Sequence, residues 1–531
     1  MDSKGNDHMG VEKLILAGLG LLAMMTLYEE TLIWLESPKN RFIILVLGIL
    51  ILGIVIGFIF RKISQMQKDS DLEKSILGKK DGAVFCGTTD KDEDVWICPK
   101  QRSMHTQVIG TTNAGKTESV ILPWAIQDIF QGRGLLLIDG KADGSLIDKL
   151  WSYTVKAGRE KDFKLFSLSR QSQSFQFNPL IGGSAEEITE RVFNAFEFEN
   201  PHYRNLQYEV MRQVMRVFEG GKVVPTFQRL HQVISNPEIL ERMAAKVEDQ
   251  SLYEWVCKFK GLSASERENR TSGLLTAISH FAFGAHAPLF NAHEGAITID
   301  DALRNNQIVY FQLPVLLSPF LGRATGKLVL QSLQAAVANR HRDPRGPKKF
   351  FSVFLDDFSE YLSESFVSIL NKSRSANVGI VFAHQALGDI KVLNDGIANS
   401  ILTNANVKVF MRGNDPESAE YFSKVIGTKT TTKFTERQKK TGIGIDRSGD
   451  LSAREVEEFQ IHPNIFKKEL GVGEAVMIIP HDRGSKTVKI KFSKTDDFAR
   501  PEPLPDVSKK ILESIKNEPA RGAVIPLEQE L

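Results

Sequence analysis

The chain has 531 residues, of which 42% are hydrophobic and 25% charged, so it is long enough to bury large cores and to form two or three domains. Its formal net charge of +2 neither favours nor excludes nucleic acid as a partner, and any basic surface must therefore be local. The cysteines, Cys86, Cys98 and Cys257, lack the spacing of a metal site or of a disulfide framework, so we expect reduced, structural thiols.

The N-terminal end differs from the rest of the chain. Residues 42–60 contain no charged residue and are long enough to cross a bilayer as a helix, and residues 14–35 hold a shorter apolar run. Arg61 and Lys62 follow directly, which favours a cytoplasmic position for all that comes after. We therefore predict a two-helix transmembrane anchor over residues 1–64 with both termini in the cytoplasm. A secretory signal is the alternative for the first segment, but it lacks a small-residue cleavage site.

Residues 110–117 match the P-loop pattern. A short apolar run at 107–109 precedes them, and apolar residues at helical spacing follow from residue 118. A strand, a Gly-rich loop and a helix in this order direct backbone N–H groups and a helix N-terminus at a polyphosphate. We predict that Lys116 reaches the β- and γ-phosphates and that the Thr117 hydroxyl binds Mg²⁺. The predicted nucleotide-binding residues are Gly110, Thr111, Thr112, Asn113, Ala114, Gly115, Lys116 and Thr117.

The rest of the chain alternates between strand and helix patterns, with one interruption. Apolar runs at 135–139, 164–168, 307–314, 350–355, 378–385, 407–413 and 474–480 are typical of strands covered on both faces, which predicts an α/β fold with a parallel sheet. Residues 185–283 carry almost only helical spacing. The predicted organisation is an anchor (1–64), a nucleotide-binding domain in two parts (65–183 and 291–499), an all-α insertion (184–290) and a charged, Pro-rich tail (500–531).

A P-loop domain needs a second carboxylate at the end of a neighbouring strand. The run 350–355 ends in Asp356, the predicted metal-shell residue, and Asp357, the predicted water-activating carboxylate. Glu360 is a reserve for that role, within one helical turn. Gln385, at the end of the next strand, is a candidate γ-phosphate sensor. Arg412, which follows a further strand, is a candidate arginine finger for the nucleotide of a neighbouring subunit.

Several of these segments, taken together, resemble the type IV secretion coupling-protein family of TraD/TraG-type conjugation ATPases. The resemblance rests on HTQVIGTTNAGKT, LLLIDGKADG, FQFNPL, FLDDFSEYLSESFVSILNKSRSANVGIVFAHQ and NANVKVFMRGNDPESAEYFSKVIG, and their order covers essentially the whole chain. It implies a RecA-like motor domain with Lys116 and Thr117 at the Walker A positions and Asp356 at the Walker B position. Relatives usually carry Glu where this chain has Asp357, which leaves the choice between Asp357 and Glu360 open.

The resemblance also implies a function: a hexameric ATPase of the bacterial inner membrane that uses ATP and Mg²⁺. Its partners would be a relaxase bound to single- or double-stranded DNA, protein effectors or adaptors, inner-membrane proteins of the secretion channel, and membrane lipid. Basic residues of the stretch 427–447, with Lys372 and Arg374, are candidates for a DNA-facing lining, although solvated loop charges are as good an account of them. The alternatives are an FtsK/HerA-type DNA translocase, a secretion ATPase that powers assembly, and a weakly hydrolysing docking platform for secreted proteins.

Overall fold

The computed structural model describes residues 50, 53–59, 61, 81–198, 200–344, 348–441, 444–495 and 502–508. The chain divides into two compact units, Met1–Asp71 and Leu72–Leu531. In the first unit residues 53–59 are helical, and Ile54 and Phe58 are exposed. Within the described residues, no helix combines the length and the apolar character that a membrane span requires. The predicted span at 14–35 and most of the one at 42–60 fall outside the described residues.

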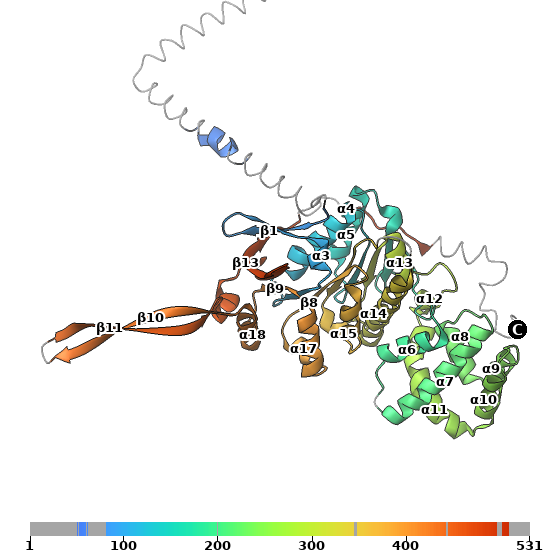
Figure 1. Cartoon of the computed structure of the whole chain (residues 1–531). Coiled ribbons are helices and arrows are strands. Elements are labelled where there is room, and N and C mark those ends of the chain that lie inside the picture. Colours follow the sequence, from blue (N-terminus) through green and yellow to red (C-terminus); the bar gives the residue numbers. More distant parts are fainter. Residues whose placement is uncertain are drawn as a thin grey trace, which may run out of the picture. The chain divides into compact units, whose positions relative to one another are not determined.

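A mixed sheet organises the second unit (Figure 1). Seven of its strands are parallel, and four more extend it on the β9 side in antiparallel pairings. The order is β2 (Asp94–Ile97), β1 (Val84–Thr89), β13 (Gly484–Phe492), β12 (Glu474–His481), β9 (Val407–Met411), β3 (Thr106–Ile109), β8 (Val378–His384), β7 (Phe351–Asp356), β4 (Leu135–Asp139), β6 (Ile308–Gln312) and β5 (Phe163–Ser167). The predicted α/β class with a parallel sheet is therefore confirmed.

The continuous apolar runs are explained by helices on both faces of the sheet. In β4, Leu135 and Leu137 pack into the apolar cluster that contains α4 (Leu122–Phe130) and α5 (Gly144–Lys156). The alternate residues Leu136 and Ile138 belong to the cluster on the other face, with α14 (Pro319–Arg342). Because successive side chains of a strand point to opposite faces, both sets must be apolar when both faces are covered.

Helices occupy the chain between β5 and β6, as the spacing predicts. They are α6 (Ala185–Ala195), α7 (Pro201–Gly220), α8 (Phe227–Ser235), α9 (Pro237–Ala244), α10 (Gln250–Gly261), α11 (Ala264–Ala282), α12 (Ala287–Phe290) and α13 (Ile299–Asn305). Their buried side chains share one apolar cluster with the adjacent face of the sheet. The helical segment is thus continuous with the core of the second unit, and its status as a separate domain stays a prediction.

Asn178 ties the two ends of this helical segment together. Its side-chain amide donates to the carbonyl oxygens of Pro225 (2.9 Å) and Ala292 (2.8 Å), and its Oδ1 accepts from the Leu180 amide (3.0 Å). The side chain is only 3% exposed. A buried side chain with all these hydrogen bonds fixes where the chain leaves the sheet and where it returns.

After β7 the chain carries short helices between strands. These are the 3₁₀ turn η4 (Phe358–Tyr361), α15 (Phe366–Ser373), α16 (Gly388–Lys391), α17 (Asp395–Asn404), α18 (Pro416–Ile426) and the π-helical turn η5 (Ile465–Glu469). The sequence predicts no strand in the basic stretch 427–447, but its described residues from Thr428 onward lie in a long hairpin of β10 (Thr428–Thr441) and β11 (Gly444–Phe459). The sequence prediction also does not include the strand β13. Its alternation of Val488, Ile490 and Phe492 with lysines is nevertheless a strand pattern.

The predicted C-terminal tail is in part a packed segment. Residues 502–508 lie against α5: the Trp151 indole donates to the Pro503 carbonyl (3.0 Å), and the Glu502 amide donates to Ser152 Oγ (3.1 Å). Leu504 and Val507 are buried. These contacts correct the expectation of a tail from residue 500, because the described part of it completes the cover over one helix.

Candidate functional site

The carboxyl ends of the parallel strands bring the predicted site residues to one edge of the sheet. Gly110 follows β3, Asp139 and Asp356 end β4 and β7, Gln385 follows β8, and Arg412 follows β9. Because β3 lies between β8 and β9, the loop after β3 is flanked by the ends of both neighbours. Strand ends that meet at one edge are the usual place for ligands in such sheets.

The loop 110–117 has a backbone that requires its glycines. Gly115 has φ of +97°, and a Cβ added there would meet Ser119 Oγ at 2.9 Å. A Cβ on Gly110 would come within 2.9 Å of Met411 Cβ in the adjacent strand. Asn113, with φ of 64°, adopts the left-handed conformation that Asn tolerates better than most residues. The loop therefore winds tightly in front of β3, as the P-loop prediction requires.

The helix after the loop starts with a π-helical turn, η1 (Thr117–Ile121), and continues as α4. Pro123 stands near the start of α4, where it cannot donate a hydrogen bond to the preceding turn. A widened turn accommodates such a residue, and single π-helical turns occur often at functional sites. The N-terminal turn that should meet the phosphates is thus wider than in an ordinary α-helix.

Lys116 lies inside the loop. Its ammonium donates to the carbonyl oxygens of Gly110 (2.6 Å) and Thr111 (3.2 Å), and the residue is 6% exposed. Burial lowers the pKa of Lys116, while the nearby carboxylate of Asp356 opposes that shift. A buried cation held by carbonyl oxygens alone is suited to bind a strongly anionic group.

Thr117 and Asp356 form the pair that the Walker motifs predict. The Thr117 hydroxyl donates to Asp356 Oδ2 at 2.7 Å, and Asp356 is 2% exposed. Burial, and then the neighbouring Asp357, raise the pKa of Asp356. No cluster of three or more His, Cys, Asp or Glu side chains in the described part of the chain could hold a metal ion unaided. One hydroxyl and one carboxylate suit Mg²⁺, which commonly takes few protein ligands and completes its shell with phosphate and water oxygens.

Asp357 turns out of β7 in the left-handed conformation, with φ of 47° and ψ of 48°. Asp occupies this region more readily than most residues, so the backbone favours the shorter acid at this position. Its Oδ2 forms an ion pair with the Lys141 ammonium at 2.9 Å, and its side chain is largely buried. The predicted water-activating carboxylate is therefore held by Lys141, which follows the neighbouring strand β4 and has no role of its own in the sequence prediction.

Asp139, at the end of β4, builds the turn that presents Lys141. Its Oδ1 accepts from the amides of Lys141 and Ala142, both at 3.0 Å, and its Oδ2 accepts from the Asp143 amide (2.8 Å) and the Tyr310 hydroxyl (2.9 Å). Burial raises the pKa of Asp139 to about 7. The motif LLLIDGKADG thus has a physical reason: the aspartate closes the turn, and the lysine reaches Asp357.

Glu360 is placed differently from Asp357. It lies on η4, where its Oε2 accepts from the Arg323 side chain of α14 at 3.1 Å and 3.2 Å. Its side chain is 37% exposed. The two acids therefore have different partners, and only Asp357 joins the group of charges formed with Lys141.

Gln385 and Arg412 line an open pocket of ≈ 630 Å³ beside the loop. The Thr112 hydroxyl donates to Gln385 Oε1 at 3.2 Å, and the Arg412 carbonyl accepts from the Thr111 amide at 2.9 Å. The pocket is lined by Thr111, Thr112, Gln385, Arg412, Asn414, Lys467, Lys468 and Leu470. The sequence does not predict its two lysines as site residues, because they follow the β10–β11 hairpin and belong to no motif. Arg412 thus lines the same pocket as its own loop, and its predicted role toward a neighbour stays a prediction.

A chain of buried polar side chains (a polar ladder) crosses the three strands β8, β3 and β9 next to the loop 110–117. His384 contacts Gln107 (3.0 Å) through Nε2, and Gln107 Oε1 accepts from the Lys408 ammonium (3.3 Å). Burial lowers the pKa of His384 to about 4, so that ring stays neutral near pH 7. The Gly110 amide donates to the His384 carbonyl at 3.3 Å. The ladder spans β8, β3 and β9 and fixes the three strand ends relative to one another.

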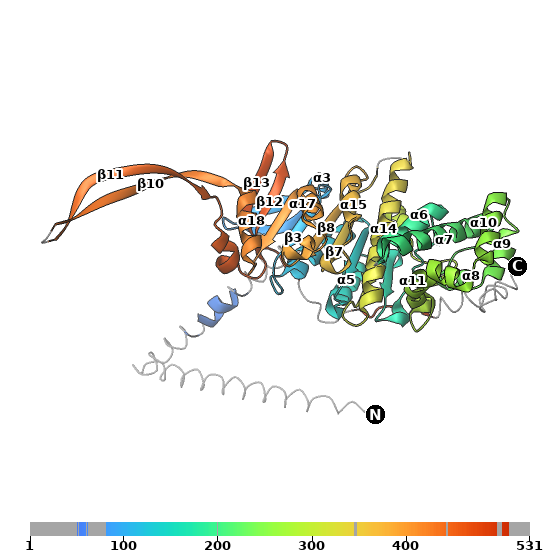
Figure 2. The same ribbon diagram turned by 90° about the horizontal axis from the view of Figure 1, so that it is seen from below.

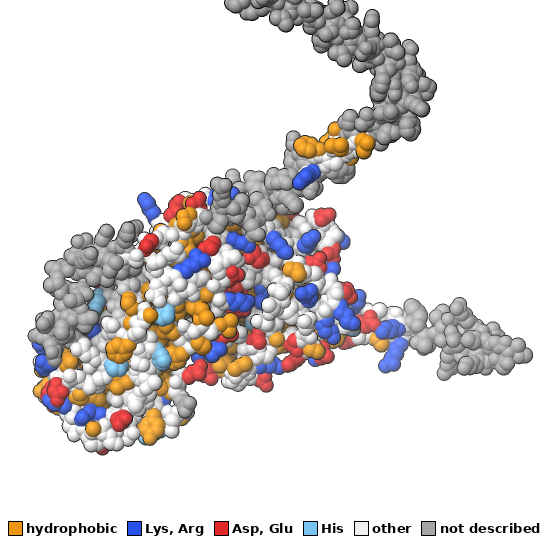
Figure 3. Space-filling model, turned by 180° about the vertical axis from the view of Figure 1, so that it is seen from behind, with side chains coloured by type: hydrophobic (Ala, Val, Ile, Leu, Met, Phe, Trp, Pro, Cys, Tyr) orange, Lys and Arg blue, Asp and Glu red, His pale blue; other side chains and the backbone are white. Residues whose placement is uncertain are grey.

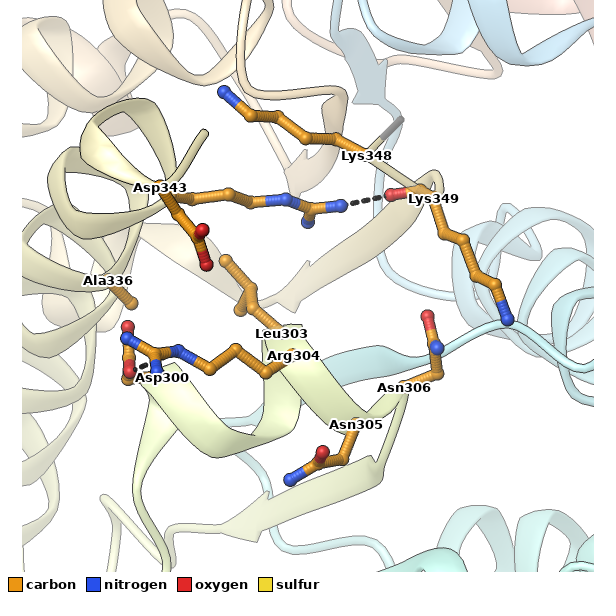
Figure 4. A pocket seen from close by; sticks show the side chains of 10 residues that line it. Asp300, Leu303, Arg304, Asn305, Asn306, Ala336, Asp343, Lys348 and Lys349 are labelled. Carbon is orange, nitrogen blue, oxygen red and sulfur yellow. Dashed lines mark hydrogen bonds and ion pairs between the residues drawn. The ribbon is translucent and has the colours of Figure 1, made fainter. Parts of the chain in front are cut away.

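A second pocket, of ≈ 480 Å³, lies near the opposite ends of β6 and β7 (Figure 4). Arg304 is paired with Asp300 at 2.8 Å, and Arg340 donates to the Lys349 carbonyl. Figure 4 shows the side chains of Lys348 and Lys349 pointing in different directions. This pocket gathers charges that do not converge on one point, so the candidate site is the edge that carries the loop.

Comparisons with known proteins agree with this geometry. The family model described as "TraM recognition site of TraD and TraG" matches residues 351–462. The type 4 coupling protein DotL of Legionella pneumophila is 23% identical over 499 residues, which cover 80% of this chain and 63% of DotL. The chain therefore spans less than two thirds of the length of that relative.

Solved structures show the same fold. The plasmid coupling protein TrwB in complex with ADP and Mg²⁺ matches with a TM-score of 0.56 and 14% identity, over 81% of this chain and 93% of TrwB. VirB4 of Thermoanaerobacter pseudethanolicus matches with a TM-score of 0.50 and 12% identity, over 79% of this chain and 98% of VirB4. The chain, with its loop, the paired Thr117 and Asp356, and the helices between β5 and β6, is thus similar to TraD/TraG-type coupling proteins in sequence and shares the fold of TrwB.

Proposed function

We propose that the chain is a Mg²⁺-dependent ATPase that works as the coupling protein of a type IV secretion or conjugation system. The observation that carries this proposal is the Thr117–Asp356 pair at 2.7 Å beside the loop that buries Lys116. A cation, a hydroxyl and a carboxylate at the end of a Gly-rich loop suit a nucleoside triphosphate with its metal ion. TrwB, which shares the fold, is described in complexes with ADP and Mg²⁺ and with analogues of ATP and GTP.

The site residues suggest distinct contributions to hydrolysis. Lys116 and the loop amides bind the phosphates, and Thr117 and Asp356 would hold Mg²⁺, which supplies charge stabilisation to the phosphate oxygens. Asp357 orients the attacking water, and Lys141 fixes the direction of that carboxylate. Gln385 senses the γ-phosphate from the end of β8. Arg412 of a neighbouring subunit would stabilise the charge that develops during transfer.

The biological setting follows the relatives by name. DotL and TrwB are called coupling proteins, and a family model for recognition of TraM matches this chain. We propose a hexamer anchored in the bacterial inner membrane by two helices within residues 1–64, with both termini cytoplasmic. It would pass DNA with its relaxase, or protein substrates, to the secretion channel. The uncharged segment 42–60 and the basic residues after it support the anchor.

The test is ATP hydrolysis by the full-length chain in detergent, with and without single-stranded DNA. We expect Lys116→Ala to lower turnover by roughly 10²–10³-fold, because the phosphates lose a buried charged donor. The exposed lysine Lys91, in the β1–β2 turn, provides the matched control Lys91→Ala, which should leave turnover unchanged. Equal turnover of Lys116→Ala and the parent would overturn the ATPase. Hydrolysis that DNA does not change would favour a carrier of protein substrates.

A further inference from the structure

The hairpin β10–β11 forms a sheet of its own. Its register runs from Thr428 opposite Phe459 to Thr441 opposite Gly444, with one irregularity between Glu436 and Gln438. In the described residues neither strand pairs with a third, so both outer edges of this ribbon lack a backbone partner. Figures 1 and 2 show the ribbon leading away from α18, with no other described strand or helix along its length. At roughly 3.3 Å per residue, 14 residues of β10 extend about 45 Å.

A ribbon of this kind is weakly stable alone. An isolated two-stranded hairpin is marginal in water, and strands gain stability when a third strand or an apolar face is added. The 14 residues of β10 contain one large apolar side chain, Phe434, so little apolar burial is available in that strand. Exposed edges with free N–H and C=O groups are templates for further strands. The fold therefore presents two pairing edges whose completion would stabilise the ribbon.

The two strands carry opposite charge. β10 has five basic residues and one acidic residue, whereas β11 has two basic and five acidic residues. At the described base of the ribbon, Lys429 and Lys433 on β10 and Glu455 and Glu457 on β11 are all exposed. Lys433 also reaches Glu458 across the ribbon at 2.5 Å. One outer edge is therefore basic and the other acidic, and the two are complementary between copies of the same chain.

We propose that the ribbons of neighbouring subunits pair edge to edge, β10 of one copy beside β11 of the next. Copies related by rotation point their ribbons the same way, so this contact is antiparallel, like the pairing inside each ribbon. Repeated around a ring, it closes into an up-and-down barrel without free edges. The proposal rests on the ring assembly of the proposed function and adds the element that joins its subunits. The five acids of β11 disfavour the other occupant, a nucleic acid, beside that strand.

The first experiment uses cross-linking between full-length chains that carry two different tags. Cys98→Ser and Cys257→Ser remove the two partly exposed thiols. The exposed residues Thr430 of β10 and Glu457 of β11 then provide Thr430→Cys in one chain and Glu457→Cys in the other. We expect a bis-maleimide to link the two tags about tenfold more in this mixture than when Glu457→Cys is mixed with Thr403→Cys, an exposed position on α17. Equal yields would overturn the proposal.

Charge reversal separates contact between copies from pairing within one copy. Two reversals each make the base of the ribbon like-charged: Lys429→Glu with Lys433→Glu makes it acidic on both strands, and Glu455→Lys with Glu457→Lys makes it basic on both. Each should reduce cross-linking about tenfold, measured for the second pair with a cysteine at a position other than Glu457. A mixture of the two reversed chains restores complementarity only between copies. We expect this mixture, with cysteines at Thr431 and Arg454, to recover the cross-link. Failure to recover would overturn the edge-to-edge contact.

The remaining outcomes distinguish this proposal from the proposed function. An oligomer by mass photometry that hydrolyses ATP but does not cross-link would refute the ribbon contact and leave the ATPase intact. A chain that stays monomeric at all concentrations would refute the ribbon contact, whatever its turnover. Loss of single-stranded DNA binding in Lys429→Glu with Lys433→Glu, with cross-linking unchanged, would reassign β10 to nucleic acid.

Discussion

The ion pair between Lys141 and Asp357 is a feature of the site that the sequence motifs do not predict. Burial by itself lowers the pKa of Lys141, but the ion pair with Asp357 and the nearby Asp356 and Asp139 raise it above its ordinary value. The lysine therefore remains charged near pH 7. In the proposed ATPase, a positive side chain at this point would both orient Asp357 and offset its repulsion of the phosphates.

Lys141→Met should lower turnover about 10–100-fold while nucleotide affinity changes less than about threefold, because Asp357 loses its direction and Lys116 keeps its phosphates. Lys141→Arg, which keeps the charge, should retain more activity than Met. Turnover and nucleotide dissociation constants, measured on the full-length chain, check this. Lys149→Met is the control, since that lysine of α5 is paired with Glu118 of η1 and not with Asp357. A large loss of affinity in Lys141→Met would mean that Lys141 binds the nucleotide itself.

The sequence predicts that most candidate site residues lie at one edge of the sheet, because their backbone positions follow from local patterns. Gly110–Thr117 lies between a strand and a helix, and Asp356 and Gln385 end apolar runs, so their shared edge follows from the parallel sheet. Lys141 and Lys467 differ in this respect. Their contribution depends on which strand ends are neighbours and on where a hairpin returns the chain, and a sequence read without contacts does not supply either.

At the scale of elements, the helices between β5 and β6 can be predicted from the spacing of apolar residues. The hydrogen bonds that attach these helices to the rest of the chain cannot. Asn178 lies in FQFNPL, a segment for which the sequence predicts no structural role. Its side-chain amide nevertheless donates to the carbonyl oxygens of Pro225 and Ala292, both more than 40 residues away in the sequence. The ribbon β10–β11, by contrast, could not be assigned as strands from its spacing. Its Thr-rich sequence has high strand propensity, but it lacks the apolar alternation on which a strand assignment depends.

Asn178→Ala should destabilise the full-length chain by about 2–4 kcal/mol, because two buried carbonyl oxygens and one amide lose their partner. Hydrogen exchange should accelerate in α8 and around Ala292 before it does in β3, since the amide clamps only the helical segment. Thermal unfolding with exchange mass spectrometry measures both effects. Asn194→Ala, at an exposed position on α6, is the control. Uniform acceleration over the sheet and helices would contradict a local clamp.

At the scale of the whole molecule, charge is balanced and not concentrated. Figure 3 shows basic and acidic side chains interspersed over the face that it presents, in keeping with a net charge of +2. A contact with DNA would therefore depend on a local set of side chains. The pocket beside the loop, with Arg412, Lys467 and Lys468, is one place where cations gather without a carboxylate in its lining.

Whether Arg412 serves its own nucleotide or that of a neighbour can be decided by mixing two inactive chains. If it acts on a neighbour, Lys116→Ala chains supply the arginine that Arg412→Ala chains lack, and a mixed ring should recover about a quarter of the parental turnover. Lys116→Ala mixed with Asp356→Asn is the control, because both changes affect the same nucleotide site and cannot complement. The two variants carry different tags, so that mixed rings can be isolated. If mixed rings recover no turnover, Arg412 acts within its own subunit.

The pairing of β1 with β13 has a consequence for biosynthesis. The N-terminal hairpin of the sheet leaves the ribosome early, but β13, the strand that joins it to the sheet, is completed about 400 residues later. At about 5–20 residues per second this interval is roughly 20–80 s. Throughout that time β1 lacks its partner β13, so Val84 and Cys86, both buried in the finished protein, lack the sheet against which they pack. The nascent chain is therefore open to chaperones and proteases at its first strand until nearly its last strand has been made.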